Sequence, residues 1–456
     1  MPPAGRPFVS DWYTENGQRW KAAISGWGHD VVNEGRIYAA AAWRIMPLLM
    51  AGWLFAYIDR VNISFARAQM GEQLGFSDAV FGLGAGLFFL GYFLFEVPSN
   101  LLLYKVGGRR WISRIMITWA IASGLTALVQ TPAQFYFMRF ALGVAEAGFI
   151  PGVVYYLSTW FPSHRLGRVF GIFYLALAGS GLVGGPLAGL ILSTCSGLWG
   201  VAGWQWLLVL EAIPSLIVGF LILRHLPDRI ENAAWLSEAE KTFAAAQFAQ
   251  EASQKNPVSL AAMAANPALW MMMLIYFLLN YAAYGLSFWL PTFIADLGIS
   301  SPMRVGLLSA LPSICAMICV VLFGLSADRC RERRWHLTAM FLTGGIGFFV
   351  FQLAGGGTVI AMAGLCLAAI CTQAFPSLFW ALPNRIWKGV ASAAGVAAIN
   401  AVGNLAGLLS PAIIGAMRTQ LGQADIAILS LGAALVLATL LVHLLPSRLI
   451  DNYGKP

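Results

Sequence analysis

Residues 40–66 read AAAWRIMPLLMAGWLFAYIDRVNISFA, and this stretch decides the fold class. A helix needs about 20 mostly apolar residues to cross a bilayer, so the stretch is long enough to span one. Its apolar run is interrupted by Asp59, Arg60 and Asn62. Because charged side chains are costly against lipid, we expect this part of the span to line a polar cavity.

The whole chain has the composition of a membrane protein. Of its 456 residues, 59% are hydrophobic and 11% are charged, whereas globular proteins contain about 25% charged residues. This composition excludes a soluble protein, and the apolar runs predict an all-α protein with twelve transmembrane helices. The predicted spans are 40–66, 80–103, 112–130, 133–157, 167–192, 204–224, 268–290, 303–325, 336–354, 358–380, 390–416 and 426–445.

The positive charge of the chain lies in short loops between the apolar runs. The formal net charge is +8, but the basic residues form no continuous stripe, so nucleic acid is not an expected partner. Among the 28 Lys and Arg residues, four lie on one side of the membrane and Arg139 lies within a span; the four are Arg60, Arg67, Arg304 and Arg418. The positive-inside rule then places the other side, with both termini, in the cytoplasm.

The longest loop divides the chain into two halves. We expect a cytoplasmic N-terminal tail, a six-helix half, a cytoplasmic linker, a second six-helix half and a cytoplasmic C-terminal tail, at 1–37, 38–224, 225–267, 268–445 and 446–456. Ser237 followed by Glu240 forms a capping box, which predicts a helix within the linker. The first 37 residues contain no short apolar core with a cleavage site, so no cleaved signal peptide is expected.

The two halves resemble each other in sequence. Matched markers in one register are Arg109-Arg110-Trp111 with Arg333-Arg334-Trp335, Pro151 with Pro376, and Pro186 with Pro411. An even number of spans separates the copies, so the two repeats have the same orientation in the membrane. Duplications of this kind place a substrate site between the halves, near the middle of the bilayer.

Ionisable residues within the spans are the main candidates for function. Arg139 and Glu146 are seven residues apart, which puts them on nearly the same face of one helix. Arg139 lies at about the depth of Asp59, so we expect these two to pair. Glu146 is then left near mid-membrane without a partner, where burial favours reversible protonation. The alternatives are a purely structural ion pair and a merely buried neutral acid.

Two further carboxyl groups are expected to be structural. Glu96 and Glu211 are predicted near the cytoplasmic ends of their spans, within reach of loop arginines or a helix N-terminus. The amides of Asn280, Asn400 and Asn404 also fall in apolar runs and need hydrogen-bond partners if they are buried.

The loop after the eighth span carries a charge cluster. It reads GLSADRCRERR over residues 324–334 and contains Asp328, Arg329, Arg333 and Arg334, which could latch one conformation closed. The corresponding loop of the first half, residues 103–110, keeps basic residues but has no acid. We therefore expect a gating latch that differs between the halves.

These features together resemble a known family. The loop pattern, the twelve spans and the parallel duplication resemble the major facilitator superfamily. Within it, YIDRVN at 57–62, GYFLFEVPSN at 91–100 and FMRFALGVAEAGFIPG at 137–152 resemble the anion:cation symporter family, and in particular bacterial transporters of tartrate and related sugar acids.

The resemblance implies proton-coupled symport of small organic carboxylates by alternating access, in the inner (plasma) membrane. It implies proton coupling by Asp59 and Glu146, and it assigns substrate binding to Arg60, Arg139, Tyr57, Tyr92, Ser377 and Asn404. The implied partners are an organic anion, protons and the lipid bilayer, with no cofactor or metal and a monomeric chain.

Three alternatives stay open at this point. A proton-coupled efflux antiporter is suggested by GLVGGPLAG at 181–189, although such glycines also serve close helix packing. Aromatic carboxylates are possible substrates if Tyr155, Tyr156 and Tyr174 line the cavity. A receptor on the same fold would need an output domain that neither tail is long enough to form.

An enzyme is not expected. The five histidines fall in tails, loops or near span ends and converge on no visible site. The six cysteines show no zinc spacing and are too scattered for a disulfide framework; Cys315, Cys319, Cys366 and Cys371 fall within apolar runs, where buried thiols are expected.

Overall fold

The computed structural model describes residues 33–253, 263–330, 333–380, 382–383, 390–422, 424–446 and 450, without the side chains of Asp328, Pro376, Ser377 and residues 390–394. The two predicted tails fall mostly outside this part of the chain. Within it, twelve spans are long and apolar enough to cross a membrane, which confirms the predicted all-α fold.

The first half contains eight helices that make six spans. They are α2 (Glu34–Val61) continued by α3 (Ile63–Leu74), α4 (Asp78–Val106), α5 (Gly108–Leu125), α6 (Pro132–Glu146) continued by α7 (Phe149–Ser158), α8 (Ser163–Thr194) and α9 (Gly203–His225). The second half contains α12 (Pro267–Ala295), α13 (Pro302–Cys330), α14 (Arg334–Leu353), α15 (Thr358–Phe379), α17 (Val390–Leu421) and α18 (Asp425–Leu444).

Side-chain caps fix where several of these helices begin. Ser77 accepts a hydrogen bond from the backbone of Val80 at the start of α4, and Asn266 caps α12 in the same way. Thr131 and Gln134 form a capping box before α6. These bonds satisfy backbone N–H groups that the first turn of a helix leaves without partners.

The fourth span is broken, which the sequence analysis did not predict. Gly148 has a φ of +84° and separates α6 from α7. A Cβ atom at this position would lie 2.5 Å from Ser99 Oγ, so only glycine suits both the backbone conformation and the space. The break makes Glu146 the last residue of α6.

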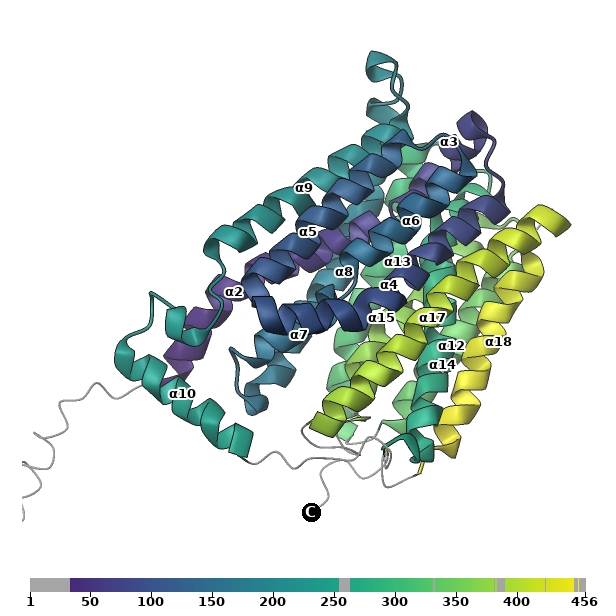
Figure 1. The fold of residues 1–456 in the computed structure, drawn as a ribbon. Helices are drawn as coiled ribbons and strands as arrows, with labels where there is room; N and C mark the ends of the chain where they lie inside the picture. The colour runs from purple at the N-terminus through teal and green to yellow at the C-terminus, as the bar shows by residue number, and fades with distance from the viewer. Residues whose placement is uncertain are drawn as a thin grey trace, which may run out of the picture.

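The two halves meet along two pairs of helices, α4 with α17 and α8 with α13 (Figure 1). Glycines allow the close approach: a Cβ on Gly86 would lie 2.5 Å from the carbonyl of Leu408, and one on Gly185 would lie 2.7 Å from that of Gly306. These contacts lie near the starts of α4 and α13. We call this end of the bundle the closed end, and the end where α10 lies the linker end (Figure 1).

The linker contains the predicted helix, α10 (Glu238–Ser253), and η3 (Ile230–Asn232). Ser237 and Glu240 form the predicted capping box. The helix docks on the first half, because Arg36 donates to Glu240 at 2.5 Å and Tyr38 donates to Gln247 at 2.7 Å. The Ser237 backbone hydrogen bond and the Arg36 guanidinium hold the pKa of Glu240 below its usual value.

Candidate transport site between the halves

A buried ion pair joins two spans of the first half. Arg60, near the end of α2, donates to the carboxylate of Glu146 at the end of α6. Arg60 is 5% exposed and Glu146 is 1% exposed. The prediction that Glu146 lacks a partner was therefore wrong, and the two predicted site residues are in direct contact.

Aromatic rings surround the guanidinium of Arg60. Its Cζ lies 5.1 Å from the ring centroid of Phe88, 5.7 Å from Trp53, 5.8 Å from Tyr92 and 5.9 Å from Tyr57. Such rings attract a cation and also exclude water. Tyr57 and Tyr92, both predicted as substrate contacts, are thus brought next to the ion pair.

Asp59 faces away from this pair, toward α5 and α9. Its carboxylate accepts hydrogen bonds from Trp119 Nε1 at 3.0 Å, Ser123 Oγ at 3.4 Å and Ser215 Oγ at 2.5 Å. The side chain is 1% exposed. Neutral donors therefore hold Asp59, and no Lys or Arg of the described residues forms a salt bridge with it.

Arg139 contacts the backbone of α2 and not the carboxylate of Asp59, so the predicted ion pair between them was wrong. Its Nη2 donates to the carbonyl of Arg60 at 3.4 Å, and its Cζ lies 5.4 Å from the ring of Phe88 and 6.0 Å from that of Phe288. Neighbouring helical residues point about 100° apart, so Arg60 faces α6 while Asp59 cannot.

The second half supplies hydroxyl and amide groups opposite these charges. Tyr57 shares a hydrogen bond of 3.0 Å with Ser287 of α12, across the interface between the halves. Tyr284 of the same helix donates to Asn404 of α17 at 3.1 Å. Asn404, predicted as a substrate contact, is buried beside this tyrosine.

Glu96 also reaches across the interface. Its carboxylate accepts a hydrogen bond of 3.3 Å from the amide of Asn400 on α17. The prediction of a partner among the loop arginines or at a helix N-terminus was wrong, because the hydrogen-bond partner of Glu96 is an amide of the second half.

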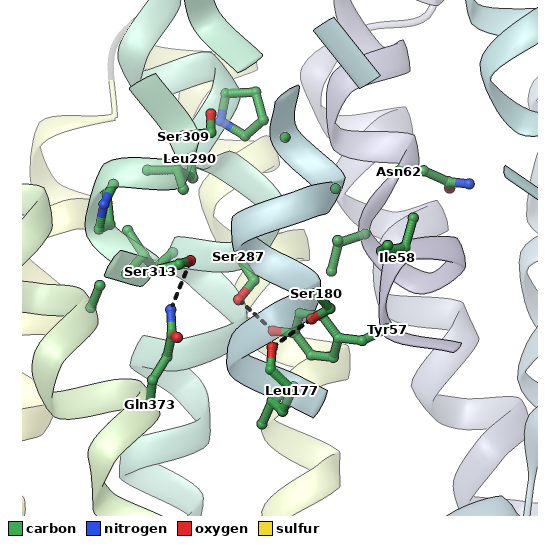
Figure 2. A pocket seen from close by; sticks show the side chains of 18 of the residues that line it. Tyr57, Ile58, Asn62, Leu177, Ser180, Ser287, Leu290, Ser309, Ser313 and Gln373 are labelled. Atoms are coloured by element: carbon green, nitrogen blue, oxygen red, sulfur yellow. Dashed lines mark hydrogen bonds between the residues drawn. The ribbon is translucent and has the colours of Figure 1, made fainter. Parts of the chain in front are cut away.

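A cavity of about 100 Å³ lies between the halves, bounded by α2, α8, α9, α12, α13 and α15 (Figure 2). Tyr57 points into it from α2 and Ser287 from α12. On the far wall, Gln373 donates to Ser313 at 3.3 Å. Tyr57 links the cavity to the aromatic ring around Arg60, so the cavity and the buried charges form one candidate site.

Glu211 lines the same cavity, so its predicted position near the cytoplasmic end of a span was wrong. It lies in the first half of α9 and is 2% exposed. Within the described part of the chain, neither carboxyl oxygen meets the geometry of a hydrogen bond. The predicted span, 204–224, was close to the observed one, so the depth of Glu211 was misjudged.

The predicted gating residues are only partly placed. Arg333 donates to a carbonyl near the end of α15 at 2.9 Å. Arg334 donates to three carbonyls at and just after the end of α18, at 3.2, 2.8 and 2.9 Å. Arg329 is exposed. The side chains of Asp328 and Ser377 lie outside the described residues, so the gating latch and the Ser377 contact stay predictions.

The first half obtains an acid for its loop from elsewhere in the sequence. Asp228, just after α9, accepts a hydrogen bond from the backbone N–H of Arg109 at 3.1 Å and lies 3.3 Å from its Nε. The loop of the first half therefore lacks an acid in its own sequence but has one beside it in the fold.

A charge cluster at the closed end was missed from the sequence. Arg418 of α17 donates to Asp78 at 2.8 Å and to Asp296 at 2.7 Å, and Arg67 of α3 pairs with Asp78. The cluster joins the two halves. The sequence signal that could have revealed this cluster is that Arg67 and Arg418 are two of the four basic residues predicted on the non-cytoplasmic side of the membrane.

Twelve spans in two halves, with buried charges beside a cavity between them, define a membrane transporter and not an enzyme. The chain matches the family model of the Major Facilitator Superfamily over residues 49–411 and belongs to that superfamily.

Relatives agree with this assignment. The chain is 40% identical to a proposed metabolite transport protein, NicT, of Pseudomonas putida, covering 93% of this chain and 98% of NicT. It is 40% identical to an Agrobacterium vitis protein whose name proposes tartrate transport, covering 92% and 97%. It is 36% identical to a quinolone resistance transporter of Acinetobacter baumannii, covering 91% and 96%.

A solved structure matches the fold. The partially occluded inward-open form of the xylose transporter XylE from Escherichia coli has a TM-score of 0.72 at 14% identity, covering 88% of this chain and 99% of XylE.

Proposed function

We propose that this protein is a proton-coupled symporter that takes up small organic carboxylates, such as tartrate or sugar acids, by alternating access. The observation that carries the proposal is the buried pair of Arg60 and Glu146, ringed by aromatic side chains beside the cavity.

The pair can couple proton binding to substrate binding, because the guanidinium of Arg60 can bind either the Glu146 carboxylate or a substrate carboxylate. While Glu146 is ionised, it occupies the Nη2 donor of Arg60 and neutralises its charge. Protonation of Glu146 removes its negative charge and frees this donor for a substrate carboxylate, which binds arginine through paired hydrogen bonds. Binding of the proton and of the anion thus favour each other.

The local charge favours an anion as substrate. Arg60 and Arg139 are both buried and face one ionised carboxylate, Glu146, while Asp59 points to other helices. An excess positive charge in a region of low polarity attracts anions strongly. Tyr57, Tyr92, Asn404 and Ser377 then supply hydroxyl and amide contacts, and Asp59 acts as the second proton carrier.

The name of the Agrobacterium vitis relative supports tartrate as a member of the substrate class. The aromatic alternative has less support. Tyr156 donates to the carbonyl of Pro227 at 2.5 Å, Tyr155 packs against Tyr104, and neither these nor Tyr174 line the described cavity.

The positive-inside rule places the linker end, and with it both termini, in the cytoplasm of a cell whose inner membrane holds the monomeric transporter. The closed end then faces outward, so the conformation described is one in which the outer gate is shut by the cluster of Arg67, Asp78, Arg418 and Asp296. Asp328, Arg329, Arg333 and Arg334 form the inner latch in the opposite conformation.

The test is uptake into proteoliposomes of labelled tartrate, sugar acids and aromatic carboxylates under an inward proton gradient, repeated with an ionophore that collapses it. The proposal expects one class of acid to accumulate only while the gradient exists. Uptake that is equally fast and equally limited with and without the gradient would contradict proton coupling.

The second candidate function is proton-coupled efflux, favoured by the quinolone resistance relative. The glycines at 181–189 do not discriminate, because Gly185 and Gly189 serve close packing against α13. Vesicles preloaded with a quinolone that empty when the gradient is imposed, while no carboxylate accumulates, would favour efflux over symport.

A further inference from the structure

We infer that Glu211 and Asn62 form a proton path between the central cavity and Asp59. The inference rests on the proposed proton coupling, and it starts from the position of Asp59. This carboxylate is bonded to donors from α5 and α9 and is 1% exposed. Ile58 and Asn62 line the cavity from the same helix, whereas Asp59 does not. A proton that reaches Asp59 from the cavity therefore needs an intermediate group.

Glu211 occupies the position such a group requires. It lines the cavity, and it lies one helical turn before Ser215, whose hydroxyl donates to Asp59. Its two carboxyl oxygens meet no hydrogen-bond geometry within the described part of the chain. Because an ionised carboxylate buried without a cation is costly, the proposed path begins with Glu211 holding a proton that it can give up.

Asn62 completes the polar wall beside Glu211. It is the residue between α2 and α3 and follows Asp59 by three residues, so the two lie on adjoining parts of one face of the first span. Its side chain points away from Tyr57 and Ser287 (Figure 2). Asn62 is the polar neighbour of Glu211, although its amide atoms meet no hydrogen-bond geometry in the described structure. Both groups are thus buried, polar and available to a proton or a water molecule from the cavity.

The charged surroundings of Glu211 are simple. The helices packed on α9 are α2, α3, α5 and α8. From α2 the ionisable neighbour is Asp59, and the described residues of the other three present no ionisable side chain that interacts with Glu211. Two adjacent acids without a cation favour a single negative charge between them. A proton held by one is therefore available to the other.

In the proposed path Glu211 gives its proton to a water molecule that enters from the cavity beside the Asn62 amide. This water passes a proton to the Ser215 hydroxyl, which passes its own proton to the carboxylate of Asp59. Glu211 is left ionised and then takes a proton from the cavity. The path makes Glu211 a positioning and relay residue for protons, with no contact to the substrate.

The test follows protonation directly, without a substrate. Infrared difference spectra after a rapid pH jump are recorded on the full-length protein in lipid, and the carboxyl band of Asp59 is assigned by its loss in Asp59→Asn. In Glu211→Gln we expect a second carboxyl band to disappear and protonation of Asp59 to slow by roughly 100-fold or more, the lower end of what a proton-transfer group contributes. Glu211→Asp should restore part of the rate.

Matched variants exclude a merely structural effect. Glu72→Gln removes an exposed carboxyl of α3 and should leave the rate unchanged. Asn62→Leu keeps the volume and should also slow protonation of Asp59, which keeps the test decisive if Glu211→Gln does not fold. Protonation of Asp59 at the wild-type rate in both Glu211→Gln and Asn62→Leu would overturn the inference. If wild-type protein fails to couple uptake to a gradient, the proposed function fails, yet the infrared rates still decide the path.

Discussion

The two halves share a fold but carry different chemistry. In the first half, Arg60, Glu146, Arg139 and Asp59 are all buried and find their polar partners within that half. The second half faces them with hydroxyls and amides, such as Ser287 and those described above. The duplication thus supplied two halves of similar fold, whereas the buried charges beside the cavity come, among the described residues, from the first half.

The matching loops of the two halves also differ in the partners of their arginines. Arg109 pairs with Asp228, while Arg333 and Arg334, at the equivalent place, donate to backbone carbonyls at helix ends. A repeated motif therefore fixes the position of a basic residue but not its partner.

The largest effect on the difference between the two halves is expected when Arg60, a buried cation of the first half, is removed. Arg60→Ala leaves Glu146 buried without its partner and removes a guanidinium from the anion site. We expect uptake to fall by more than about 100-fold, because loss of one partner of a buried pair costs about 3–5 kcal/mol. Initial uptake rates measure this effect.

The control for Arg60→Ala is Arg60→Lys, which keeps the charge but not the forked geometry, and should retain a small fraction of activity. Arg60→Ala combined with Glu146→Gln should recover thermal stability without recovering uptake. Wild-type uptake in Arg60→Ala would show that the charged pair is not part of the site.

Arg139→Ala tests the second cation of the first half. Arg139 donates to the backbone and not to a carboxylate, so its removal breaks no salt bridge among the described residues. We expect substrate affinity to fall by about 10- to 100-fold, corresponding to about 1.5–3 kcal/mol for a charged hydrogen bond. Binding measured at a saturating proton concentration isolates this effect, and unchanged affinity there would leave Arg139 as scaffold.

The contacts between the halves are tested at the closed end. Arg418→Ala removes the bonds to Asp78 and Asp296 that join α17 to α4 and α12. We expect the population to shift several-fold toward the conformation open at this end, because partly exposed ion pairs contribute about 1 kcal/mol each. Spin-label distances between α4 and α17 report the shift, and an unchanged distribution would mean that glycine packing alone holds this end closed.

The smallest effect is expected in the linker. The pKa of Glu240 is lowered in the folded protein, so its contribution to α10 docking is complete above the pKa of the unfolded chain, about 4.3. It is lost as the pH falls through the lower folded value. The protection of residues 238–253 against hydrogen exchange, measured relative to the intrinsic exchange rate at each pH, should therefore fall on acidification, and Glu240→Gln should flatten this response. An identical pH response in the variant would remove Glu240 as its cause.

Much of the fold could be predicted from the sequence, because apolar length and charge position are one-dimensional signals. The twelve spans and the linker helix followed from them. The pairing of Arg60 with Glu146 could not, because depth alone does not tell which of two neighbouring residues, 59 or 60, faces α6. The break at Gly148 was equally hidden, since glycine also occurs within unbroken helix, as Gly143 does in α6.

The position of Glu211 beside the cavity was missed for a different reason. Its position within the span was readable, but a carboxyl group near a helix end and one beside a cavity look alike in sequence. Only the packing of α9 against α2 places it next to Asn62 and near Asp59.

The most direct test of the central claim is Glu146→Gln in proteoliposomes, with gradient-driven accumulation and substrate exchange measured on the same preparation. The account predicts that accumulation is lost while exchange persists, because Arg60 is freed permanently and no proton is released from this site. Full gradient-driven accumulation by Glu146→Gln would contradict it.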